Sequence, residues 1–87
     1  MKAIIYTRGG NENRQIKECE KYAKANGITV IEAVSTENGL SAYVFNMQTD
    51  AIIVSDAPRI ARKKNDYMFT EDMLQKFGIK LLVAEGK

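Results

Sequence analysis

The chain of 87 residues contains no histidine and no tryptophan, and it has one cysteine and one proline. A lone cysteine cannot form an intramolecular disulfide, and without histidine a zinc site lacks its usual ligands. No apolar run approaches the ~20 residues needed to cross a bilayer, and the apolar stretch after Met1 and Lys2 is too short for a signal peptide. These absences predict a cytoplasmic domain with no metal, no other cofactor and no membrane partner.

Charge is nearly balanced, with 13 basic and 11 acidic residues and a net charge of +2. This balance does not imply a polyanion partner, although a local basic cluster can still bind one. The hydrophobic fraction of 45% and the charged fraction of 28% are ordinary for a soluble globular protein. A chain of this length is expected to form one small domain with a single core, spanning residues 1–87.

Alternating β-prone and amphipathic segments predict a βαβαβαβ order with three helices. We expect strands at residues 3–6, 29–34, 51–54 and 80–84. The middle helix is expected around residues 40–47. Right-handed crossovers make such a sheet parallel, and 2-1-3-4 is the natural doubly wound strand order. The fold class is therefore α/β, with a four-stranded, mainly parallel sheet.

The helix ends and helix faces follow from local patterns. Asn11 or Asn13 is expected to cap the first helix, and Asn65 or Asp66 the last. Each of these helices ends before a Gly-Ile pair in which the glycine accepts the left-handed conformation. The residues expected to face inward are Ile16, Cys19, Tyr22, Ala23 and Asn26 in the first helix, and Phe69, Met73, Leu74 and Phe77 in the last.

Two loops carry the candidate site. In the predicted strand order, strands 1 and 3 are neighbours, and their carboxyl ends form the switch point at which ligands bind. Residues 6–10, Tyr-Thr-Arg-Gly-Gly, follow the first strand, and residues 58–62, Pro-Arg-Ile-Ala-Arg, follow the third. We expect Arg8, Arg59 and Arg62 to converge there, since guanidinium groups match phosphate oxygens.

A structural interpretation of the same residues stays open. Arg8 could pair with a carboxylate such as Glu37 or Asp56, leaving the other arginines solvated. Neither loop supplies a nucleophile or an obvious base. Cys19 lies on the helix stripe and is expected to be a buried structural thiol, and Ser55 has nothing nearby to activate it.

Together the motifs resemble the catalytic domain of serine recombinases, the resolvases and invertases, from Met1 to about Ala84. That family opens with a strand ending in Tyr-x-Arg-(Val/Ile)-Ser, which corresponds to residues 6–10 here. A helix with Gln and then Cys/Leu and Tyr-Ala follows, and residues 15–23 read Gln-Ile-Lys-Glu-Cys-Glu-Lys-Tyr-Ala. The later motif Asp-Arg-(Leu/Ile)-(Ser/Gly/Ala)-Arg corresponds to residues 58–62.

The resemblance implies a resolvase-like (flavodoxin-like) three-layer fold and assigns roles to the loop residues. In the family, the serine of the first motif attacks a DNA phosphodiester, and the arginines of both motifs hold the scissile phosphate. Arg8, Arg59 and Arg62 match the phosphate-binding positions. Gly10 stands at the position of the nucleophile and Pro58 at that of the aspartate, so we expect no catalytic residue and no enzyme. Thr7 does not replace the serine, because strand alternation points it away from Arg8.

The expected function is that of a catalytically inactive module for protein interaction or regulation, linked to DNA recombination or a mobile element. The chain stops where the family continues into a long dimerisation helix and a DNA-binding domain. The expected partner is another protein or a second copy of the chain. It is expected to bind at a sheet edge or at the apolar residues Val44, Phe45 and Met47. The alternatives are weak DNA or phosphate binding by the arginines without cleavage, and an active recombinase fragment with a nucleophile elsewhere.

Overall fold

The computed structural model describes residues 1–35, 49–61 and 63–85. The elements, in chain order, are β1 (Lys2–Thr7), α1 (Glu12–Ala25), β2 (Thr29–Ser35), β3 (Ala51–Val54), the 3-10 turn η3 (Ala57–Arg59), α2 (Lys64–Lys76) and β4 (Lys80–Val83). The strands form one sheet of order β2-β1-β3-β4 with parallel neighbours, which confirms the predicted topology. The helix expected around residues 40–47, and the patch of Val44, Phe45 and Met47, lie outside the described residues.

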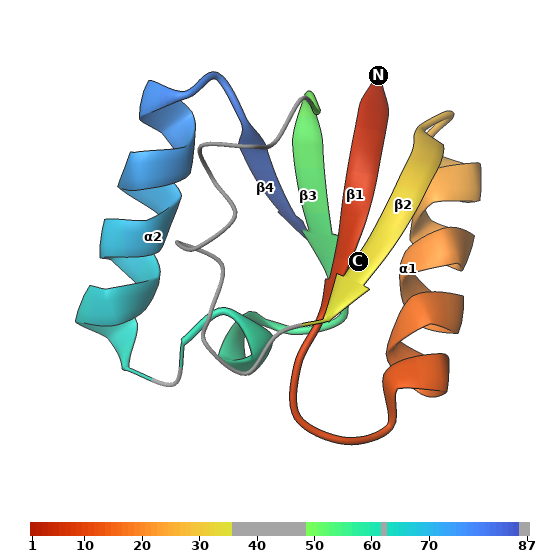
Figure 1. The fold of residues 1–87 in the computed structure, drawn as a ribbon, viewed down its shortest axis with the longest axis horizontal. Helices are drawn as coiled ribbons and strands as arrows, with labels where there is room; N and C mark the ends of the chain where they lie inside the picture. Colours follow the sequence, from red (N-terminus) through yellow and green to blue (C-terminus); the bar gives the residue numbers. More distant parts are fainter. Residues whose placement is uncertain (36–48, 62, 86–87) are drawn as a thin grey trace.

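Two helices cover opposite faces of the sheet, so the domain has three layers (Figure 1). Successive side chains of a strand point to opposite faces. Ile5 and Ile53 pack under α1, while Ile52 and Val54 pack with Leu74 of α2. Both central strands, β1 and β3, are therefore buried on both sides, which explains why their sequences are apolar without alternation.

Both helices end at the predicted glycines. Gly27 has φ 67° and Gly78 has φ 73°, a backbone conformation that favours glycine. The N–H of Ile28 donates to the carbonyl oxygen of Ala23 at 2.8 Å, and the N–H of Ile79 donates to that of Leu74 at 3.0 Å. These bonds satisfy carbonyl groups that the last helical turns would leave without a partner.

The predicted side-chain caps at the helix starts are wrong. Asn11 precedes α1 but has a left-handed backbone (φ 59°), whereas a capping side chain needs extended backbone, and it makes no capping hydrogen bond. The extended residue before α2 is Lys63, whose side chain cannot accept a hydrogen bond. Asn65 and Asp66 therefore lie inside the first turn of α2.

The predicted inward face of α2 is wrong at two positions. Leu74 is fully buried, but Phe69 is 69% exposed and Phe77 is 48% exposed. The helix turns Leu74, with the partly buried Tyr67 and Met73, to the sheet, so Met73 faces inward as predicted while Phe69 and Phe77 do not. In α1, the buried residues are Gln15, Cys19 and Ala23, and Asn26 is exposed just beyond the helix.

Candidate functional site: the loops after β1 and β3

The loops after β1 and β3 start side by side because the two strands are paired. Ile4 lies opposite Ile52 and Ile5 opposite Ile53 in parallel register. After β1 the chain continues into α1, and after β3 it continues through η3 into α2. The helices α1 and α2 lie on opposite faces of the sheet. This arrangement produces the switch point at which parallel sheets bind ligands.

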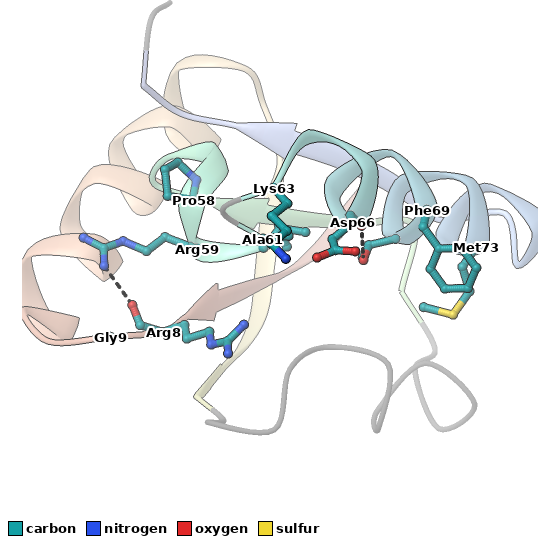
Figure 2. Close-up of a pocket in the computed structure, with 11 residues that line it drawn as sticks. Arg8, Gly9, Pro58, Arg59, Ala61, Lys63, Asp66, Phe69 and Met73 are labelled. Carbon is teal, nitrogen blue, oxygen red and sulfur yellow. Dashed lines mark hydrogen bonds between the residues drawn. The ribbon is translucent and has the colours of Figure 1, made fainter.

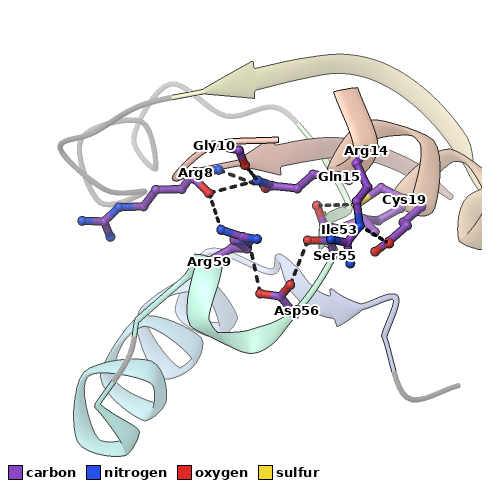
Figure 3. A network of polar contacts seen from close by, with 10 residues as sticks. Arg8, Gly10, Arg14, Gln15, Cys19, Ile53, Ser55, Asp56 and Arg59 are labelled. Atoms are coloured by element: carbon purple, nitrogen blue, oxygen red, sulfur yellow. Dashed lines mark hydrogen bonds and ion pairs between the residues drawn. The ribbon is translucent and has the colours of Figure 1, made fainter. Parts of the chain in front are cut away.

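Gln15, in the first turns of α1, holds the loop after β1 in place (Figure 3). Its side chain is 2% exposed. The N–H of Arg8 donates to Gln15 Oε1 at 3.1 Å, and Gln15 Nε2 donates to the carbonyl oxygens of Arg8 at 3.0 Å and Gly10 at 2.7 Å. A buried amide with both ends engaged is well satisfied, so this side chain fixes the loop backbone.

The sequence motif places Gln15 on the first helix but does not by itself indicate this role. The signal was available, because Gln15, Cys19 and Ala23 recur every four residues and form the buried stripe of α1. A polar side chain at the start of a buried stripe must find hydrogen-bond partners nearby. The backbone of the adjoining loop supplies them.

Arg59 is occupied by contacts within the protein. Its Nη1 donates to the carbonyl oxygen of Arg8 at 3.0 Å, and its Nε forms an ion pair with Asp56 Oδ1 at 3.2 Å without hydrogen-bond geometry. Asp56 Oδ2 accepts from the hydroxyl of Ser55 at 3.3 Å. Asp56, considered above as a partner of Arg8, thus pairs with Arg59, and this arginine ties η3 to the loop after β1.

The two glycines of the loop differ in what they allow. Gly9 has φ 79°, and a Cβ built there would lie 3.0 Å from Arg59 Nη1, so a side chain at this position would strain the backbone and crowd that guanidinium. Gly10 has no such backbone conformation, and a Cβ there has no atom within 4 Å. The structure therefore has room for a side chain at Gly10.

The fold brings the Arg59 side chain against the backbone carbonyl group of Arg8, while Arg62 lies outside the described residues. Both Arg8 and Arg59 line a pocket of about 720 Å³ between the loop after β1, η3 and α2 (Figure 2). Pro58 lines it as well. The guanidinium of Arg8 and the ammonium of Lys63 make no hydrogen bond or ion pair with another described residue. These two cations of the pocket therefore have no partner among residues 1–35, 49–61 and 63–85.

The hydroxyls of Thr7 and Ser55 and the thiol of Cys19 are buried. Thr7 is 2% exposed and its Oγ1 donates to the carbonyl oxygen of Val34 at 3.4 Å, and Ser55 is 1% exposed. Burial, with smaller effects from the charges of Glu18, Asp56 and Glu20, raises the pKa of the Cys19 thiol to about 12. That thiol stays protonated at neutral pH and is a poor nucleophile.

Within the part of the chain that the structure describes, no group of His, Cys, Asp or Glu side chains is arranged to hold a metal ion. Among these same residues, no helix has the length and apolar character to span a membrane.

Residues 5–87 match the protein family described as Resolvase, N terminal domain. The chain belongs to this family. The fold is also that of serine recombinase catalytic domains. The C-terminal catalytic domain of ISC1926 TnpA, an IS607-like serine recombinase, is 21% identical with a TM-score of 0.77, over 100% of this chain and 69% of that one. The N-terminal catalytic domain of TP901-1 integrase is 22% identical with a TM-score of 0.78, over 97% of this chain and 77% of that one. No curated protein sequence matches the chain.

These findings confirm the resemblance inferred from the loop motifs and the predicted resolvase-like fold. The resolvase-like domain places Gly10 and Arg8 in the loop after β1, and Pro58 and Arg59 in the turn after β3.

Proposed function

We propose that this resolvase-like domain does not cleave DNA and serves as an interaction or regulatory module in DNA recombination or in a mobile element. One observation carries the proposal: when residues 6–10 are matched to the family motif Tyr-x-Arg-(Val/Ile)-Ser by resemblance, Gly10 falls at the position of the nucleophilic serine. Attack on a phosphodiester needs a side-chain nucleophile, and glycine has none. The partner of such a module is another protein or a second copy of the chain.

The surroundings of Gly10 support the same conclusion. The hydroxyls of Thr7 and Ser55 are buried and directed to Val34 and Asp56, so neither is exposed to a DNA strand. The Cys19 thiol is fully buried under α1. Tyr6, the remaining hydroxyl-bearing residue within residues 6–10, is fully buried.

The test is a search for covalent protein–DNA adducts. The protein is incubated with a pool of random-sequence duplexes, the mixture is denatured in detergent, and labelled DNA is examined for a protease-sensitive mobility shift. We expect no adduct from the natural chain. An adduct that survives denaturation and disappears with protease would overturn the proposal.

Gly10→Ser is the informative companion variant, because the site has room for the side chain. An adduct from this variant alone would locate the loss of activity at position 10. Light scattering coupled to size-exclusion chromatography tests the module itself, with dimer formation or a stable complex as the expected result.

A second candidate function is DNA-phosphate binding without cleavage, and it is favoured by the guanidinium of Arg8, which lines the pocket and has no ion-pair partner among the described residues. Duplex binding should fall with rising salt, and Arg8→Ala should reduce the slope of that dependence by about 1. Lys17→Ala on the exposed face of α1 is the matched control. Arg59→Ala and Arg62→Ala complete the series. Duplex binding that none of the arginine variants affects would exclude this function.

A further inference from the structure

The pocket beside Arg8 has a size and a chemistry that phosphate contacts alone do not explain. Its volume of about 720 Å³ falls in the range of small-molecule sites. Its described lining is cationic at one end and apolar at the other. Figure 2 shows Arg8 and Lys63 reaching into the space from two sides, with Phe69 and Met73 at its far end along α2.

The cationic end suits a phosphate group. Arg8 and Lys63 approach it from different segments, and neither is engaged with another described residue. Arg59, by contrast, is held by Asp56 and the Arg8 carbonyl group, so it contributes to the shape of the pocket more than to its free charge.

The apolar end suits a flat aromatic ring. Phe69 lines the pocket and is 69% exposed, although an apolar ring of this size is normally turned to the core. Met73 lies one turn further along the same stripe and also lines the pocket. An exposed aromatic ring beside a cationic groove is the arrangement on which unpaired bases stack.

Between the two ends stands Asp66, which also lines the pocket. Its carboxylate would repel a phosphate placed against it, but it can accept a hydrogen bond from a sugar hydroxyl. From Lys63 to Phe69 the backbone advances roughly 9 Å at the rise of an α-helix. Cation, hydrogen-bond acceptor and aromatic ring thus follow one another along α2 in the order of phosphate, sugar and base.

We propose that this pocket binds one unpaired nucleotide, with its phosphate on Arg8 and Lys63 and its base against Phe69. The nucleotide is either a free mononucleotide or a residue of a single strand, since both present the same chemistry. The site is independent of DNA cleavage and of a protein partner, because it needs no nucleophile and uses no sheet edge.

The experiment measures binding of AMP and of a fluorescein-labelled oligothymidylate to the whole chain, by calorimetry and fluorescence anisotropy. Phe69→Ala should weaken binding about tenfold, since stacking of one base is worth on the order of 1.4 kcal/mol or more. Phe69→Tyr should keep it. Met68→Ala is the matched control, because Met68 is 49% exposed on α2 and does not line the pocket. Thermal denaturation of each variant verifies folding.

The outcomes separate the two sources and the competing explanations. Binding of AMP that depends on Phe69 assigns the site to a free nucleotide, and Phe69-dependent binding of the oligonucleotide alone assigns it to a single strand. Binding that Phe69→Ala leaves unchanged, or that inorganic phosphate displaces as well as AMP does, would refute the proposal. Failure of both probes to bind would also refute it. None of these results alters the adduct test of the proposed function, so the two can fail separately.

Discussion

Replacing Gln15 with alanine should destabilise the domain strongly, because this one buried side chain makes several hydrogen bonds. The side chain is 2% exposed and makes three hydrogen bonds to the backbone of the loop after β1. A net contribution of about 1 kcal/mol for each bond gives a loss of about 2–3 kcal/mol, because the Arg8 carbonyl oxygen keeps its second donor, Arg59. For a domain of this size the loss corresponds to a decrease in Tm of roughly 10–20 °C.

The assay is urea denaturation of the natural chain and of the variant, followed by circular dichroism. Gln75→Ala is the matched control, since Gln75 is exposed on α2 and its substitution should change stability by less than about 0.5 kcal/mol. If Gln15→Ala behaves like this control, the three hydrogen bonds do not support the loop and the reasoning is wrong.

A second variant distinguishes the contribution of the hydrogen bonds to stability from the contribution of side-chain packing. Gln15→Glu keeps the acceptor for the Arg8 N–H but, when ionised, has no donor for the carbonyl oxygens of Arg8 and Gly10. Protonation of that carboxyl restores a donor, so the folded state favours the protonated form. The sign follows: the variant should be least stable at neutral pH and should recover as the pH falls. A stability deficit that does not change with pH would contradict the hydrogen-bond explanation.

Two further predictions concern the same site. Gly9→Ala should lower the free energy of unfolding by about 1–2 kcal/mol, because it places a Cβ at a positive φ and 3.0 Å from a guanidinium nitrogen. Gly10→Ala should change it by less than about 0.5 kcal/mol. Equal urea midpoints for the two variants would contradict this difference. Burial raises the Cys19 thiol from its ordinary pKa of 9.0 to about 12, so native protein at pH 8 should react with iodoacetamide far more slowly than protein unfolded in urea. A pKa that is higher in the folded state also means that this part of the stability is intact below pH 9 and declines as the pH rises toward 12, and Cys19→Ala should remove that decline.

The sequence by itself determined the topology and the location of the site. The unbroken apolar runs of β1 and β3 indicate that both faces of these strands are buried. Gly27 and Gly78 end the two helices because glycine readily adopts the left-handed backbone conformation. Strand order follows from general rules of parallel sheets, and it places Arg8 and Arg59 at one edge. The loop motifs were sufficient to indicate the resolvase family.

Only the tertiary structure decided what each of these side chains does. Whether Phe69 or Leu74 faces the sheet depends on the rotation of α2 over its neighbours, a contact between segments distant in sequence that helical periodicity leaves open. Arg59 is committed to Asp56 and the Arg8 carbonyl group because folding brings β3 beside β1. Patterns along the chain report which residues are apolar or charged, but the partner of a polar group is set by three-dimensional packing. Arg59 is therefore paired, whereas the Arg8 side chain has no partner among the described residues.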